Sequence, residues 1–108
     1  MIIDEHFDRS TVRVHLGDVV ELRLAENPTT GFRWRMTKDG RPVCDVKDEA
    51  YQRLGTAPGA GGVHRWTFDA TQTGRSTVEL LYRRAWEAAA PAGRSFSFTL
   101  EVDRRAGD

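Results

Sequence analysis

The strongest constraint on the fold is an alternation of apolar and polar residues that runs through most of the chain. Its clearest example lies near the end, where Phe96, Phe98, Leu100 and Val102 alternate with polar neighbours. A two-residue period is typical of a β-strand with one buried face, because successive side chains of a strand point to opposite sides. No segment shows the 3.6-residue period of an amphipathic helix. The sequence therefore predicts an all-β protein.

The same alternation recurs along the chain between turn-forming residues. Further strands are predicted in which one face carries Val12, Val14 and Leu16; Val20, Leu22 and Leu24; Phe32, Trp34 and Met36; His64, Trp66, Phe68 and Ala70; or Val78, Leu80 and Tyr82. A short strand is expected at Val43 to Val46, followed by an irregular strand or connection over residues 47–57. Gly17-Asp18 predicts a turn that joins the first two strands as a hairpin. Seven to eight short strands indicate an immunoglobulin-like antiparallel β-sandwich.

Length and charge restrict the possible functions. The 108 residues suit a single domain, expected to span the whole chain with a core over about 10–103 and frayed termini. Sixteen Lys and Arg balance sixteen Asp and Glu, so the molecule lacks the long-range positive field that usually accompanies binding to nucleic acid or anionic membranes. Neither is an expected partner, no cofactor is implied, and the free protein is expected to be a monomer.

The first residues do not resemble an export signal. Met1 to His6 lack a positively charged stretch followed by an apolar one, and no run approaches the roughly 20 apolar residues of a membrane-spanning helix. A cytoplasmic location is expected unless a signal was removed.

The segment Asn27-Pro28-Thr29-Thr30-Gly31-Phe32 combines turn residues with small polar side chains. Pro28 restricts φ to near −65°, Gly31 permits a positive φ, and the Asn27 side chain can bond the backbone ahead of it. The two threonines are therefore expected at the tip of a shaped loop.

Two further segments lie between predicted strands. Gly59-Ala60-Gly61-Gly62 precedes a strand rather than a helix, and no Lys-Ser or Lys-Thr follows it, so a phosphate-binding loop is not supported. Arg84-Ala85-Trp86 follows the strand that ends near Tyr82. Trp34 and Trp66 are in phase with core positions, whereas Trp86 is expected in a loop, where an exposed aromatic residue favours contact with a partner.

In this order, the three segments resemble the chagasin family of cysteine-peptidase inhibitors over about Val12 to Val102. Asn27 to Phe32 matches the first family motif in full, and Trp34 matches the aromatic residue after it. Gly59 to Gly62 matches the second motif. Arg84 and Trp86 match the third, but Ala85 stands where the family usually has proline, and Val63 where it commonly has threonine.

The resemblance implies an immunoglobulin-like sandwich that reversibly inhibits papain-like cysteine peptidases by placing three loops across the catalytic cleft. It assigns peptidase contacts to Asn27, Pro28, Thr29, Thr30, Gly31, Phe32, Gly59, Ala60, Gly61, Gly62, Arg84 and Trp86. Without the proline, the Trp86 loop is less pre-organised, so weaker inhibition is expected. The alternative is a noncatalytic immunoglobulin-like interaction module without inhibitory activity.

An enzyme has no support in the sequence. His6, His15 and His64 lie in different segments without metal-ligand spacing, so no metal site is expected, and they are interpreted as surface or strand-edge residues. Cys44 falls in an apolar strand and is interpreted as a buried structural thiol. No Gly-x-Ser-x-Gly or His-Glu-x-x-His motif is present.

Overall fold

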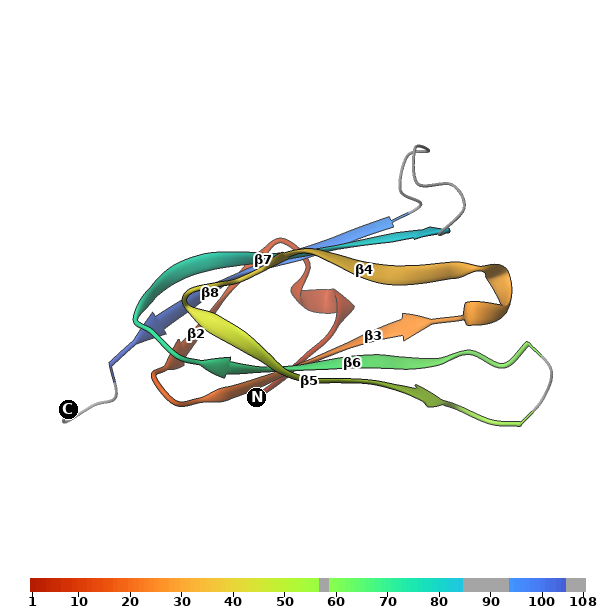
Figure 1. Cartoon of the computed structure of the whole chain (residues 1–108), viewed down its shortest axis with the longest axis horizontal. Coiled ribbons are helices and arrows are strands. Elements are labelled where there is room, and N and C mark those ends of the chain that lie inside the picture. The colour runs from red at the N-terminus through yellow and green to blue at the C-terminus, as the bar shows by residue number, and fades with distance from the viewer. Residues whose placement is uncertain (57–58, 85–93, 105–108) are drawn as a thin grey trace.

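Two four-stranded sheets pack face to face in the computed structural model, which describes residues 1–56, 59–84 and 94–104 (Figure 1). One sheet has the order β1 (Ile2–Ile3), β3 (Val19–Glu26), β6 (Gly62–Ala70) and β5 (Cys44–Arg53). The other has the order β2 (Ser10–His15), β8 (Arg94–Asp103), β7 (Gly74–Arg84) and β4 (Phe32–Asp39). Short 3₁₀ turns occupy Glu5–Phe7 and Pro28–Thr30. The predicted all-β sandwich is confirmed.

The core lies between the sheets and is built from the residues that the alternation places inward. Phe68 of β6 and Phe98 of β8 meet edge to face, with ring centroids 6.0 Å apart. Trp34 and Trp66 are only 5% and 2% exposed, as predicted for core residues. Full burial of one large apolar side chain contributes about 1.5–3 kcal/mol. No helix among the described residues is long and apolar enough to cross a membrane.

The predicted hairpin between the first two strands is wrong, because β2 and β3 belong to different sheets. β2 runs parallel to β8, from Ser10 opposite Phe98 to His15 opposite Asp103, whereas β3 runs antiparallel to β6. A two-residue period shows which face of a strand is buried. It does not show whether the next strand pairs with it as a hairpin or belongs to the other sheet. Gly17 ties this connection to β6 by donating its N–H to the carbonyl oxygen of Ala70 (2.9 Å).

The strands are not all antiparallel. β1 runs parallel to β3, as β2 does to β8, and the other four ladders are antiparallel. β5 is also longer than the strand expected at Val43 to Val46. It pairs with β6 from Cys44 to Arg53, with an irregularity between Val46 and Asp48. Most of its side chains are exposed, and this exposure removes the alternation that the sequence prediction needed.

The strand directions place three connections at one end of the sandwich. β3, β5 and β7 all finish at the right-hand end in Figure 1, where β4, β6 and β8 begin. The connections after β3 and β5 contain the first two predicted loops. Residues 85–93, with Ala85 and Trp86 of the third segment, lie outside the described residues, as do residues 57–58.

Candidate functional site

The described parts of the three predicted segments are joined by hydrogen bonds at this end of the sandwich. The side-chain amide of Asn27 donates to the carbonyl oxygen of Gly59 (3.1 Å). The Nε of Arg84 donates to the carbonyl oxygen of Thr30 (3.2 Å). Segments that are more than thirty residues apart in sequence therefore form one surface, which we call the loop end.

The loop after β3 is held by its own side chains. Asn27 caps the 3₁₀ turn, and its Oδ1 accepts the N–H of Thr29 (3.2 Å) and the hydroxyl of Thr29 (2.6 Å). The hydroxyl of Thr30 donates to the carbonyl oxygen of Asn27 (2.8 Å). Pro28 begins the turn, and Gly31 ends it with a φ of 82°. The predicted turn chemistry is confirmed, and Thr29 and Thr30 are exposed at its tip.

Aromatic side chains fix the loop to the sheet beneath it. Phe32 stacks on Tyr82 with ring centroids 5.3 Å apart, and Tyr82 packs against Trp34 at 4.7 Å. The guanidinium of Arg84 lies 4.6 Å from the centroid of the Phe32 ring, within cation–π range. Arg84 thus contacts both the ring and, through Thr30, the backbone of the first loop. It supports this loop from β7.

The glycines of the second segment have different local roles. Gly59 is exposed with a φ of 79°, a conformation that favours glycine. Gly62 is buried at the start of β6, where a Cβ would collide with the carbonyl oxygen of Gln52 and lie 2.5 Å from the Tyr51 hydroxyl. Ala60 and Gly61 lie between them and are half-buried. Packing against β5 therefore requires a residue without a side chain at Gly62.

A network of two carboxyl side chains and a histidine beneath the loops escaped the sequence interpretation. Glu26 is 3% exposed, and its carboxylate accepts the backbone N–H of Trp34 (2.7 Å) and lies 3.0 Å from Nδ1 of His64. The Nε2 of His64 lies 2.7 Å from the carboxylate of Glu49. A ring protonated on both nitrogens donates to both carboxylates. His64 also stacks on Trp66 at 3.9 Å.

The surface or strand-edge position expected for the three histidines is therefore wrong for His64, although His6 and His15 are exposed. The side chain of His64 is 12% exposed, and β6 is an inner strand of its sheet. Two signals in the sequence point to the network. Glu26 continues the inward phase of the strand before the loop, and His64 shares the phase of Trp66.

Cys44 is fully buried, as predicted for a structural thiol. Burial raises the pKa of this thiol to about 11, and the nearby negative charges of Asp39 and Asp45 add to the effect. A thiol in this state is a poor nucleophile at neutral pH. Among the described residues, no group of three His, Cys, Asp or Glu side chains could hold a metal ion.

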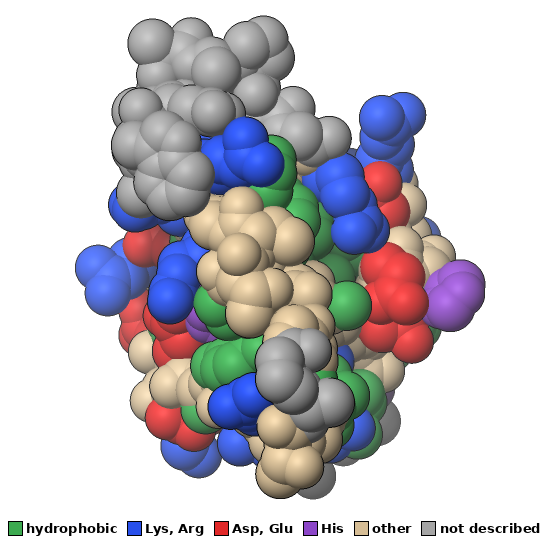
Figure 2. Space-filling model, turned by 90° about the vertical axis from the view of Figure 1, so that its right-hand side faces the viewer, with side chains coloured by type: hydrophobic (Ala, Val, Ile, Leu, Met, Phe, Trp, Pro, Cys, Tyr) green, Lys and Arg blue, Asp and Glu red, His purple; other side chains and the backbone are tan. Residues whose placement is uncertain are grey.

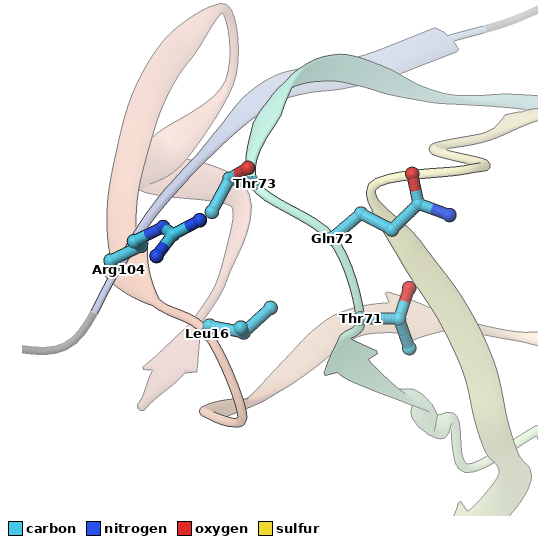
Figure 3. Close-up of a pocket in the computed structure, with 5 residues that line it drawn as sticks. All are labelled: Leu16, Thr71, Gln72, Thr73 and Arg104. Atoms are coloured by element: carbon cyan, nitrogen blue, oxygen red, sulfur yellow. The ribbon is translucent and has the colours of Figure 1, made fainter. Parts of the chain in front are cut away.

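A pocket at the opposite end of the sandwich contains none of the predicted site residues. It is lined by Leu16, Thr71, Gln72, Thr73 and Arg104. Figure 3 shows Leu16, Thr73 and Arg104 facing one another, while Thr71 and Gln72 point away from them. Figure 2 shows the loop end, where a tan tip is bordered by apolar, basic and acidic side chains. A shallow groove in this surface is lined by Pro28, Thr29, Tyr51, Arg53 and Ala60.

Known proteins share both this sequence pattern and this fold. A family model described as chagasin family peptidase inhibitor I42 matches residues 13–102. Amoebiasin-1 of Entamoeba histolytica is 32% identical over 103 residues, which cover 95% of this chain and 98% of the relative. The cysteine protease inhibitor EhICP2 from the same organism has the same fold, with a TM-score of 0.85, 20% identity and 94% of each chain covered.

A further solved structure, PbICP-C in complex with falcipain-2, matches with a TM-score of 0.57 and 15% identity, covering 90% of this chain and 88% of that one. The likeness shows that the two share a fold. The resemblance expected from the three segments is confirmed by the family model and by amoebiasin-1, both of which span nearly the whole chain. The protein belongs to the chagasin family of peptidase inhibitors.

Proposed function

We propose that the protein reversibly inhibits papain-like cysteine peptidases by inserting its loop end into the catalytic cleft. Membership in a family of peptidase inhibitors makes it an inhibitor rather than an enzyme. The observation that carries the proposed mode of binding is the pair of hydrogen bonds from Asn27 to Gly59 and from Arg84 to Thr30. They hold the candidate contact segments together before any partner arrives.

The chemistry of the loop end suits a narrow cleft. Thr29 and Thr30 present short polar side chains at the tip, and Gly59 adds exposed backbone without a side chain. No charged residue occurs in Asn27–Phe32 or Gly59–Gly62, so inserting them removes no ionised side chain from water. Because the first loop is already ordered by its own hydrogen bonds, binding costs less conformational entropy.

The proposed contact set is the one expected from the family motifs, with distinct roles for its members. Thr29 and Thr30 approach the catalytic centre, and Gly59 to Gly61 lie along the cleft. Phe32, Gly62 and Arg84 hold these segments in place. Trp86 supplies an anchor for the peptidase, an assignment that rests on the sequence alone, through the family motif and the expected position of this aromatic residue in a loop. An interface of this kind buries roughly 1,600 Å², and a central tryptophan supplies about 2 kcal/mol of its binding free energy.

The test is a titration of papain with the protein while hydrolysis of a small peptide substrate is followed. We expect inhibition that is reversed by dilution. Replacing Thr29 with alanine should weaken inhibition several-fold, and replacing Trp86 with alanine should weaken it about 30-fold, which corresponds to the 2 kcal/mol above. Thr11, exposed on β2 and away from the loops, is the matched threonine control, and T11A should inhibit like the wild type.

Two results would reject this proposal. One is the absence of inhibition of papain and of a cathepsin at micromolar concentration by protein whose circular dichroism confirms the fold. This result would favour the noninhibitory interaction module. The other is equal inhibition by T29A, W86A and the wild type, which would place the contact surface elsewhere on the molecule.

A further inference from the structure

His64 contacts a carboxyl group with each of its two ring nitrogens. Nδ1 lies 3.0 Å from Oε2 of Glu26, and Nε2 lies 2.7 Å from Oε2 of Glu49. Each contact is a hydrogen bond only if it contains a proton, because a ring nitrogen and a carboxylate oxygen are otherwise both acceptors. A neutral imidazole between two ionised carboxylates has one proton for these two contacts. The arrangement in the structure therefore requires a second proton.

The two carboxyl groups differ in their access to water. The side chain of Glu49 is 54% exposed, so water can solvate it when its contact with the ring is lost. The side chain of Glu26 is only 1% exposed, and the same Oε2 that faces His64 also accepts the N–H of Trp34. Loss of the second proton therefore removes the positive charge that lies against a buried carboxylate. A buried charge deprived of its partner is strongly unfavourable.

Charged and titratable side chains from the neighbouring strands also face this network. They are a tyrosine and an arginine on β5, two charged residues on β4, a tyrosine on β7 and an arginine on β8, namely Tyr51, Arg53, Lys38, Asp39, Tyr82 and Arg94. Side chains of these types ordinarily keep one charge state between about pH 5 and 9. Histidine is the side chain whose charge ordinarily changes in this range. A change in the charge of the network is therefore expected at His64.

Glu26 connects the network to the first two contact segments. Asn27 follows it directly and begins the first loop, and Gly62 pairs with it across the β3–β6 ladder. Glu26 also lines a cleft of about 250 Å³, which is bordered by Asn27 from the first segment and by Gly61 and Gly62 from the second. Water that enters to solvate the Glu26 carboxylate therefore comes between these two segments.

We propose that His64 is a positioning residue, whose positive charge holds the first two contact segments at the separation that the peptidase cleft accepts. The inference deepens the proposed function and rests on it. The peptidase then binds the network more tightly when it holds the second proton. Protonation and peptidase binding favour each other by linkage, so affinity is complete at low pH, where the free inhibitor holds this proton, and falls as the pH rises and the proton is lost.

The experiment measures the inhibition constant for papain at a series of values between about pH 5 and 9, which include the ordinary titration of histidine. The wild type is compared with H64Q, which cannot carry the charge, and with E26Q. A neutral amide oxygen in E26Q can replace the Oε2 that contacts Trp34 and His64, so no buried carboxylate then depends on the ring. H6Q/H15Q removes the two exposed histidines and is the matched control. Circular dichroism at each pH checks the fold.

Ratios of inhibition constants at one pH cancel the titration of papain itself. We expect H64Q to inhibit about 10-fold more weakly than the wild type at the acidic end of the range, and within about twofold of it at the alkaline end. The two converge because the wild type loses a charge that H64Q never has. A purely structural role for His64 would instead weaken H64Q by the same factor at every pH. The ratio of E26Q to H64Q should stay constant, and H6Q/H15Q should follow the wild type throughout.

A ratio of H64Q to the wild type that does not change with pH would overturn the inference, because the charge of His64 would then have no effect. Loss of the pH dependence in H6Q/H15Q would also overturn it by assigning the dependence to an exposed histidine. If H64Q does not fold, E26Q decides the question, and equal pH profiles for E26Q and the wild type reject the inference. In each case the wild type still inhibits, and the proposed function stands. Failure of the wild type to inhibit at any pH would overturn both.

Discussion

At the residue scale, Glu26 connects three strands through one buried side chain. Its carboxylate accepts the N–H of Trp34 on β4 and lies against His64 on β6, while Glu26 itself ends β3. Its backbone carbonyl oxygen accepts the hydroxyl of Tyr51 on β5 (3.3 Å). The next residue is Asn27, so the position of the first loop depends directly on this network.

Replacing Glu26 with alanine should lower the free energy of unfolding by about 3 kcal/mol, because the change leaves a buried N–H and a largely buried histidine without their partner. The measurement is urea unfolding followed by tryptophan fluorescence. Glu21 provides a control on the same strand, since it forms only a partly exposed pair with Arg23, and E21A should cost less than about 1 kcal/mol. Equal losses for E26A and E21A would contradict a structural role for the buried network.

Cys44 provides a prediction of pH dependence. Its thiol pKa is raised from 9.0 to about 11 in the folded protein, mainly by burial and further by Asp39 and Asp45. The unfolded chain therefore releases this proton at lower pH than the folded protein does. The contribution to stability is complete below pH 9 and is lost as the pH rises toward 11.

The free energy of unfolding should thus fall more steeply between pH 9 and 11 for the wild type than for C44A, as measured by urea titrations at each pH. The comparison with C44A cancels the titration of lysine and tyrosine side chains that both proteins share. Parallel pH profiles for the two proteins would show that the thiol does not contribute.

At the scale of elements, β6 begins at a position that tolerates no side chain. Gly62 pairs with Glu26 of β3 on one side and with Arg53 of β5 on the other, and a Cβ there would collide with β5. The second predicted segment is therefore part loop and part strand. Its glycines look alike in sequence, but Gly62 is a buried strand residue and Gly59 is an exposed loop residue.

G62A should lose about 2–3 kcal/mol of stability, because overpacking forces the Tyr51 side chain and the β5 backbone to move. G59A should lose only about 1 kcal/mol, since no atom lies within 4 Å of its Cβ and the cost is that of a positive φ. Chemical denaturation of both variants compares them. A larger loss for G59A would show that loop conformation, not packing against β5, requires the glycines.

Two elements show why the sequence prediction of strands was incomplete. The alternation at Val12 and Val14 correctly identified β2 and its buried face, but it carried no information about whether β3 or β8 would be the neighbour. β5 was underestimated for the opposite reason. The strand is ten residues long and pairs with β6, yet its side chains beyond Cys44 are mostly exposed, so its hydrophobic pattern gives little sign of a strand.

At the scale of the whole molecule, the two sheets share one core, and a strand near the start of the chain pairs with the last strand. β2, near the start, pairs with β8, near the end, and every other strand lies between them in sequence except β1. Neither sheet consists of a continuous stretch of chain, because consecutive strands β2 and β3, and β3 and β4, lie in different sheets. One sheet cannot form its core face without the other. These features support the prediction of a single domain.

Equilibrium unfolding should accordingly be a single cooperative transition. Tryptophan fluorescence, which includes the buried Trp34 and Trp66 from different sheets, should change with the same midpoint in urea as far-ultraviolet circular dichroism. Two separated transitions, with the circular dichroism changing at a different urea concentration from the fluorescence, would show that the sheets unfold independently and would reject the single domain.

The sequence by itself determined the class of fold, most of the core, the turn at Asn27 to Gly31 and the family. These properties depend on local spacing or on short motifs. A two-residue period shows which face of a strand is buried, and the residues of the Asn-Pro-Thr-Thr-Gly segment themselves favour its turn geometry. Only the tertiary structure decided that Arg84 supports the first loop, that Glu26 meets His64, and that Arg33 faces Arg83. Each of these contacts joins residues far apart in sequence, and such contacts depend on strand neighbours and register, which local patterns do not specify.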